Sequence, residues 1–115
     1  MAVTAHATGT HTSDGTETFV TSPNVAGTFQ FVVDLNDMVD GDTVILKVYQ
    51  MVLTGGTSRV LYTVRRDDIQ PAEDKIVNVG PVSNELSDAT SLRFSIQGTT
   101  TAGTISVPWK VLKFA

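Results

Sequence analysis

The sequence of 115 residues contains no cysteine, and its basic residues are missing from one whole region. Without cysteine, disulfides, zinc–thiolate sites and thiol nucleophiles are all excluded. Residues 1–46 carry six acidic side chains and no base, whereas all eight Lys and Arg lie from Lys47 onward. The net charge is −4, and only Arg65 and Arg66 are adjacent, so no clustered basic face is available to neutralise phosphates. We therefore expect no nucleic-acid partner.

Long apolar runs are also missing. The longest are far shorter than the roughly 18 residues that suggest a membrane span, and the N-terminus has neither the basic nor the apolar region of a secretory signal. We therefore expect no membrane partner and a cytoplasmic site of folding. In addition, no window of eleven residues shows the i, i+3, i+4, i+7 apolar spacing of a long amphipathic helix.

Residues 1–22 have few large apolar side chains and are rich in threonine, with seven threonines in that stretch. Threonine favours extended backbone, but this segment can bury little surface to offset its ordering entropy. We expect residues 1–26 to form an extended N-terminal arm or an edge strand. As an arm they would be mobile in the free protein and would add to a neighbouring subunit's sheet on assembly, while Phe19, Val20 and Val25 could instead anchor them in their own domain.

Residues 27–115 alternate apolar and polar side chains with the period of two that is typical of strands. Gly55-Gly56 predicts a hairpin turn, and the strand before it is apolar on both faces, so we expect that strand to be central. Residues 83–90 could form at most one helical turn. Pro108 predicts an edge position or a bulge. The expected strands are 29–35, 43–53, 58–65, 75–79 (ending before Gly80-Pro81), 92–97 and 104–114.

Together these features predict an all-β fold. Seven or eight short strands with frequent turn signals favour a single-domain antiparallel β-sandwich, with a jelly roll or a flattened barrel as the specific alternatives. The alternation also predicts which side chains form the core. They are Phe29, Phe31, Leu46, Val48, Val60, Tyr62, Phe94, Ile96 and Trp109.

The stretch DLNDMVDGDTV, residues 34–44, is the most acidic segment and could be read as a calcium loop. An EF-hand loop needs an oxygen ligand at its fifth position and a bidentate Glu at its twelfth, but Met38 stands at the fifth and no Glu follows in range. Asn36-Asp37 and Asp40-Gly41-Asp42 are instead typical turn residues. We interpret the stretch as two turns between strands, with weak calcium binding as the alternative.

Other candidate sites are weaker still. His6 and His11 lack the further ligands that a metal centre needs, so we expect exposed polar histidines. Glu73 and Asp74 are adjacent and would face opposite ways in a strand. No G-x-S-x-G turn presents a nucleophile. Trp109 could stack on a sugar, but a core or interface role is favoured. We expect no enzymatic activity, no cofactor and no required metal.

Three segments carry a resemblance to a known family. GTFQFVVDLNDMVDGDTVILKV from Gly27, SRVLY from Ser58 and GTISVPWKV from Gly103 resemble the small β proteins encoded among the head genes of tailed bacteriophages. In that family a strand ending in aspartate-leucine precedes a met-x-x-gly-asp turn, and a tryptophan strand closes the chain. The resemblance covers residues 27–112.

This resemblance implies a capsid decoration or cement protein that sits on the major capsid protein lattice at the virion surface. Self-association is expected as well, and a trimer would suit threefold positions. The rival hypothesis is a carbohydrate- or receptor-binding β-sandwich of a phage tail or cell-wall protein, which would need an exposed aromatic platform; only eight aromatics are present. The residues expected to contact a partner are Thr4, His6, His11, Lys113 and Phe114.

Overall fold

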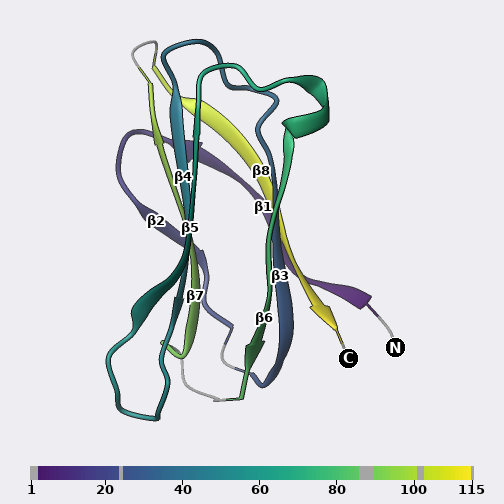
Figure 1. Cartoon of the computed structure of the whole chain (residues 1–115), viewed down its shortest axis with the longest axis vertical. Coiled ribbons are helices and arrows are strands. Elements are labelled where there is room, and N and C mark those ends of the chain that lie inside the picture. Colours follow the sequence, from purple (N-terminus) through teal and green to yellow (C-terminus); the bar gives the residue numbers. More distant parts are fainter. Residues whose placement is uncertain (1–2, 24, 86–89, 101–102, 115) are drawn as a thin grey trace.

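The computed structural model describes residues 3–23, 25–85, 90–100 and 103–114. Within these residues the chain forms an antiparallel β-sandwich of two four-stranded sheets, as predicted (Figure 1). None of the described residues belongs to a helix long and apolar enough to cross a membrane. The elements in chain order are β1 (Val3–Ser13), β2 (Thr18–Thr21), β3 (Gly27–Asp34), β4 (Thr43–Gln50), β5 (Arg59–Asp67), the short 3-10 helix η1 (Ala72–Asp74), β6 (Ile76–Asn84), β7 (Leu92–Thr99) and β8 (Ile105–Phe114).

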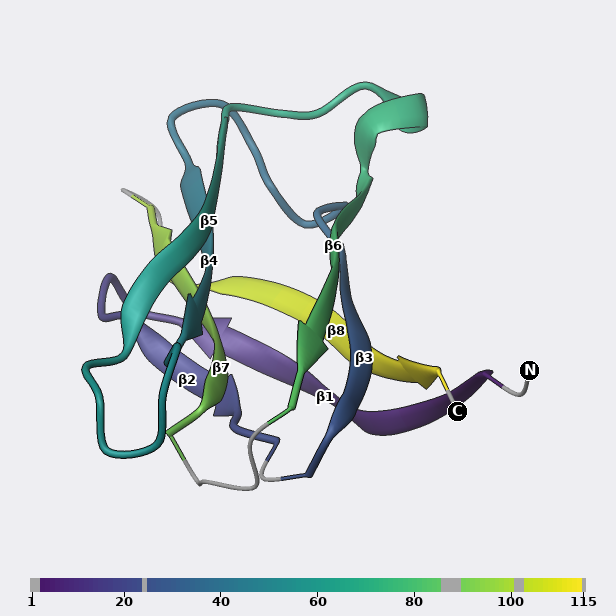
Figure 2. The ribbon, with the colours of Figure 1, turned by 60° about the horizontal axis from the view of Figure 1, so that its bottom comes forward.

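The strand order identifies the sandwich as a jelly roll. The first sheet has the order β1-β8-β3-β6 and the second has the order β2-β7-β4-β5 (Figure 2). The first strand therefore pairs with the last, the second with the seventh, the third with the sixth and the fourth with the fifth. This is the arrangement of one long hairpin wrapped into two facing sheets, each of which presents one face to the core.

The core lies between the inward faces of the two sheets and contains most of the predicted residues. The rings of Phe31 on β3 and Phe94 on β7 pack with centroids 5.1 Å apart and are fully buried. Burying a side chain of this size stabilises the fold by roughly 1.5–3 kcal/mol. Phe29, Leu46, Val48 and Ile96 are also buried, as the period-two alternation predicts.

Two predicted core residues are not in the core. Val60 and Tyr62 on β5 are 47% and 43% exposed, and only Val64 of that strand packs against the buried cluster. β5 is the last strand of its sheet and has a neighbour on one side only. Alternation assigns side chains to a face but does not guarantee that the face is covered. Trp109 on β8 is half-buried and packs against the core.

The N-terminal residues belong to the sandwich in this structure. β1 is an edge strand of the first sheet and pairs with β8 of the same chain over its whole length, with one irregularity between Ala5 and Ala7. Gly9 lies opposite Trp109, and a Cβ on Gly9 would come within 3.0 Å of the indole. The docked edge strand is thus the observed arrangement, and addition to a partner's sheet on assembly stays a prediction.

The predicted turns agree with the structure, but two strand ends differ clearly, because the strand predicted over 43–53 ends at Gln50 and β6 is longer than predicted. β4 is central in its sheet and forms the predicted hairpin with β5, in which Gly55 has a φ of 81°. The strand predicted to end before Gly80-Pro81 continues to Asn84, because an edge strand tolerates proline and a register shift. At Pro108, β8 pairs with β1 and not with β3. Pro108 therefore occupies the predicted edge position, although β8 from Trp109 onward has a neighbour on both sides. The single turn predicted in 83–90 lies partly outside the described residues.

Candidate functional site

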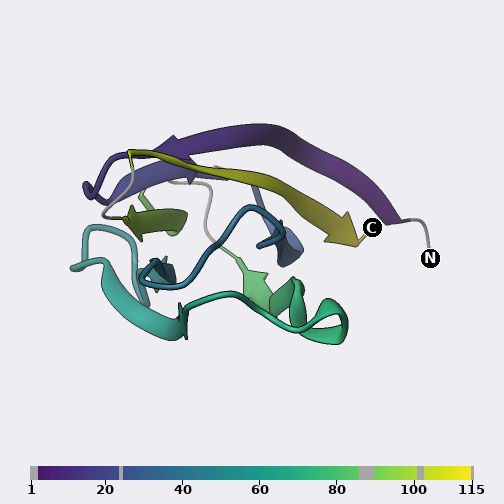
Figure 3. The same cartoon turned by 90° about the horizontal axis from the view of Figure 1, so that it is seen from above.

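Three of the residues predicted to contact a partner lie together at one corner of the first sheet. Thr4 is the cross-strand neighbour of Lys113, and Phe114 follows on the same strand. Figures 1 and 3 show both ends of the chain at this corner, because β1 and β8 run side by side. The stem of Lys113 lies across Gly27, where a Cβ would approach Lys113 Cε to 3.0 Å. Lys113 and Phe114 are therefore partly packed within their own domain, whereas Thr4 is exposed.

The two histidines, both on β1, have different surroundings. His6 is exposed, and its ring meets Phe29 edge-on with centroids 5.3 Å apart. His11 faces the inside of the sandwich, like the buried Ser13 two residues on, and is half-buried rather than exposed as predicted. Burial lowers the pKa of His11, although Asp14 opposes this effect. His11 Nε2 has no hydrogen-bond partner within the described part of the chain, so a neutral, packed imidazole results.

The aspartate stretch forms turns in which the carboxylates accept backbone hydrogen bonds. Asp34 Oδ1 accepts from the Asn36 amide at 2.9 Å, which is an Asx turn at the end of β3. Asp42 is buried, and its Oδ2 accepts from the Val39 amide at 3.0 Å. Leu35 lies buried beneath these turns. The stretch therefore closes one end of the sandwich, as predicted.

Two other aspartates of the stretch accept hydrogen bonds from the start of β8 and from the connection after β5. Asp37 Oδ2 accepts from the Ser106 amide at 2.8 Å, and Asp40 Oδ1 accepts from the Ile69 amide at 3.3 Å. Over the four described ranges, no group of three or more His, Asp and Glu side chains is arranged to hold a metal ion. The carboxylates of Asp37 and Asp40 thus link the stretch to β8 and to the connection after β5, which are far from it in sequence.

A polar and aromatic cluster on the outer face of the second sheet was not predicted. Tyr49 Oη donates to Glu17 Oε2 at 2.9 Å, and Ser95 Oγ donates to the same oxygen at 2.6 Å. The ring of Phe19 meets that of Tyr49 edge-on at 5.2 Å, and the Arg93 guanidinium lies 3.5 Å above the Phe19 ring. The cluster joins β2, β7 and β4, so it fastens the short strand β2 to the sheet.

The electrostatics of this cluster favour an ionised carboxylate. Burial raises the pKa of Glu17, but the hydrogen bonds from Ser95 and Tyr49 and the positive charges of Lys47 and Arg93 outweigh it, and the net pKa is lowered. Burial, followed by the adjacent Glu17, raises the pKa of Tyr49. A carboxylate with a lowered pKa is a weak general base, and its oxygens already accept two hydroxyl groups. The geometry thus fits a structural role.

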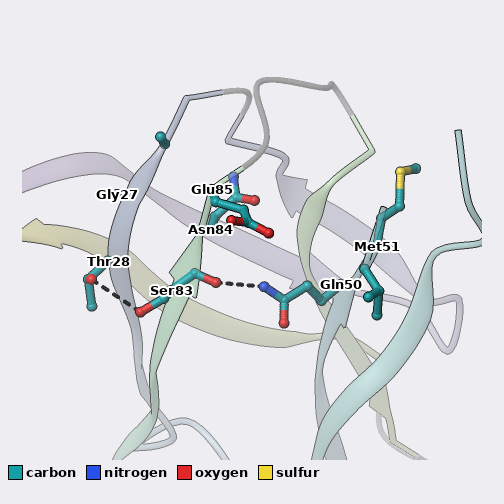
Figure 4. A pocket seen from close by; sticks show the side chains of 9 residues that line it. Gly27, Thr28, Gln50, Met51, Ser83, Asn84 and Glu85 are labelled. Carbon is teal, nitrogen blue, oxygen red and sulfur yellow. Dashed lines mark hydrogen bonds between the residues drawn. The ribbon is translucent and has the colours of Figure 1, made fainter. Parts of the chain in front are cut away.

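A cavity of about 620 Å³ opens at the opposite end of the sandwich from the aspartate turns (Figure 4). Gln50 on β4 bridges the two sheets by donating from Nε2 to the Ser83 carbonyl at 2.6 Å. On the far side of β6, the hydroxyls of Ser83 and Thr28 lie 3.4 Å apart. The lining combines these polar groups with apolar ones and one carboxylate. It includes Gly27, Thr28, Gln50, Met51, Ser83, Asn84 and Glu85.

The most exposed apolar surface of the described residues lies on the β4–β5 hairpin. Val60, Leu61 and Tyr62 follow one another along β5, and each is more than 40% exposed. The connection before β5 adds Val52 and Leu53, which are 80% and 72% exposed. Large apolar side chains that remain exposed along one edge are candidates for an interaction surface. We refer to Val60–Val64 as the β5 edge.

Comparison with protein-family models, curated proteins and solved structures finds no match for the chain. The β5 edge and the Glu17 cluster therefore rest on geometry alone. Sequence reasoning missed the β5 edge because its alternating valines and tyrosine predict an inward face. The Arg59, Arg65 and Arg66 side chains that flank it were the available signal, since an edge strand is commonly marked by charged residues.

Proposed function

We propose that this protein is a structural virion protein, namely a capsid decoration or cement protein that binds the major capsid protein lattice and stabilises the head. It would assemble in the host cytoplasm and sit on the capsid surface. Self-association is part of the same proposal, with a trimer suited to threefold positions. The resemblance of residues 27–112 to phage head proteins supports this function, and so does the jelly-roll strand order, which recurs in viral capsid domains.

The observation that carries the proposal is the contrast between an exposed apolar edge and carboxylates that are hydrogen-bonded within the chain. Val60, Leu61 and Tyr62 offer area to a partner. By contrast, the carboxylates of Glu17 and Asp42 accept hydrogen bonds from the chain itself. A protein that contributes buried area rather than chemistry needs this combination, because association between proteins depends on complementary surface.

Purified virus particles provide the test. Particles from the host that carries this gene would be separated from free protein, and the chain would be counted by mass spectrometry and located by cryo-microscopy. A decoration protein is expected in hundreds of copies on the shell. A few copies at the tail would favour the rival function, and absence from purified particles would overturn the proposal.

The rival function is carbohydrate or receptor binding by a phage tail or cell-wall protein. Phe19 and Tyr49 supply aromatic rings on the outer face of the second sheet. However, the Arg93 guanidinium covers one face of the Phe19 ring, and the Tyr49 hydroxyl already donates to Glu17. A sugar would therefore find neither an uncovered ring face at Phe19 nor an unpaired hydroxyl at Tyr49. Specific binding on a glycan array, abolished by Phe19→Ala, would favour this rival over the capsid proposal.

A further inference from the structure

The sandwich has four sheet edges, formed by β1, β6, β2 and β5, and they differ in length, regularity and exposed apolar side chains. β2 has only four residues, and β1 carries an irregularity between Ala5 and Ala7. β6 contains Pro81 and a register shift opposite Phe29 and Phe31. Short strands, bulges and prolines are the usual means by which proteins blunt their edges. β2 and β6 are therefore poor templates for strand addition, and the residues of β1 are mostly small or polar, so that edge offers little apolar surface.

The fourth edge, β5, differs in that it is long and exposes large apolar side chains, and its register is regular from Tyr62 onward. The strand has nine residues, and the run from Val60 to Val64 contains no proline and no charged side chain. Its one register shift falls at Leu61, next to the hairpin end of the strand. β5 pairs with β4 only, so its outer backbone groups have no strand partner in the described chain. An extended apolar edge of this kind accepts an additional strand through main-chain hydrogen bonds.

The charges beside the β5 edge indicate the chemistry of its partner. Arg59 precedes the apolar run, and Arg65 and Arg66 follow it. The single acid of the strand, Asp67, already accepts hydrogen bonds from Arg65 and from the Thr43 hydroxyl at 2.7 Å. Arg65 is thus paired with Asp67, whereas the guanidinium groups of Arg59 and Arg66 have no ion pair within the described residues and are available to a partner. Complementary charges at the rim of an interface steer association and fix register.

A second copy of this chain is a poor occupant of the same edge. The β4 partners of Arg59 and Arg66 lie equally far along β4 from the partner of Thr63. A symmetric antiparallel pair centred on Thr63 would therefore place Arg59 of each copy opposite Arg66 of the other. Like charges directly opposite each other destabilise a pair of strands.

We propose that β5 is the docking strand of this protein and that it takes up an extended, apolar segment with acidic residues at both ends, which adds as a fifth strand to the second sheet. The proposal rests on the proposed function in one respect, because the segment is supplied by the capsid lattice. The added strand pairs its main chain with β5. Its acidic ends meet Arg59 at one end and Arg66 at the other.

The first test uses a capped synthetic peptide in which valines and threonines alternate between two terminal pairs of glutamates. Its binding to the isotope-labelled protein would be followed through backbone amide resonances. We expect shifts concentrated on residues 59–67 and an affinity that falls as salt is added, because exposed charges are screened. A matched peptide with lysines in place of the glutamates is expected to bind at least about tenfold more weakly. Equal binding of both peptides, or shifts confined to β1 or β6, would overturn the proposal.

The second test uses variants of the protein. Arg59→Glu combined with Arg66→Glu is expected to weaken binding of the acidic peptide about tenfold. The melting temperature should change little, since Arg59 is exposed and Arg66 is only half-buried. Lys110→Glu is the control, because it makes the same kind of charge reversal on an exposed position of the other sheet. Equal losses in the double variant and the control would refute docking at β5. So would a free protein that self-associates through β5, as shown by Thr63→Cys crosslinking in this cysteine-free chain.

Binding of the protein to decoration-free virus particles distinguishes this inference from the proposed function. Wild-type protein that fails to bind decoration-free particles would contradict the capsid role, while the peptide experiment would still decide the chemistry of β5. Conversely, wild-type protein that binds particles, together with a folded Arg59→Glu/Arg66→Glu variant that binds them equally well, would leave the capsid role in place and remove β5 as the docking strand.

Discussion

The two edges of the second sheet differ in how their strands are held. β2 is four residues long, and Glu17, Phe19, Tyr49, Arg93 and Ser95 link it to the sheet through hydrogen bonds and ring contacts. β5 is nine residues long, and its apolar middle is exposed. The β2 edge is held by contacts of its own side chains, whereas the β5 edge leaves apolar side chains exposed. The two edges of one sheet therefore differ in whether contacts within the chain cover their side chains.

The largest effect is expected at the centre of the sheet, on which both edges depend. Phe94 on β7 is fully buried and packs against Phe31 of the opposite sheet. Phe94→Ala should lower the free energy of unfolding by about 3–5 kcal/mol, because it removes apolar contacts and leaves a cavity. Chemical denaturation monitored by circular dichroism measures this loss. A change below about 1 kcal/mol would contradict the packing described here.

An intermediate and pH-dependent effect is expected at the β2 edge. The folded state lowers the pKa of Glu17, so the carboxylate contributes stability at pH values above its ordinary pKa of 4.5, and this contribution is lost as the pH falls through the lower folded value. Glu17→Gln should cost about 1 kcal/mol at pH 7, since two hydrogen bonds to a partly exposed charge are weakened.

The pH dependence of the stability of Glu17→Gln gives a second test of the β2 edge. The stability of the wild type should decline more steeply than that of Glu17→Gln as the pH is lowered below 4.5, so the two curves should converge in acid. Thermal melts across this range measure both curves. Parallel curves would show that Glu17 is not held as an ion by Ser95 and Tyr49.

The smallest effect on stability is expected at the β5 edge. Leu61 is 45% exposed and lies at the irregularity of the strand. Leu61→Thr should change the free energy of unfolding by no more than about 0.5 kcal/mol, because an exposed side chain loses little packing. Denaturant titration of the free protein measures this value. A loss comparable to that of Phe94→Ala would mean that β5 is covered in solution and that the contrast between the two edges is wrong.

The sequence predicted the sandwich and most of its core because period-two alternation is a local property of each strand. It predicted the turns at Asn36-Asp37 and at Asp40-Gly41-Asp42 for the same reason, since a turn forms between residues close in the chain. It did not predict the cluster around Glu17. Tyr49 and Ser95 lie 32 and 78 residues away, and only the strand order brings them together. The exposure of β5 depends likewise on which strand ends the sheet.

The contact between Gly9 and Trp109 makes the protein its own fluorescent reporter. Trp109 is the single tryptophan of the chain, and its indole covers the backbone of β1 where a larger residue would not fit. If β1 leaves β8, for example on assembly, the indole gains solvent on that side, and its emission should shift to longer wavelength. The N-terminal strand can therefore be followed optically, in real time and without any label.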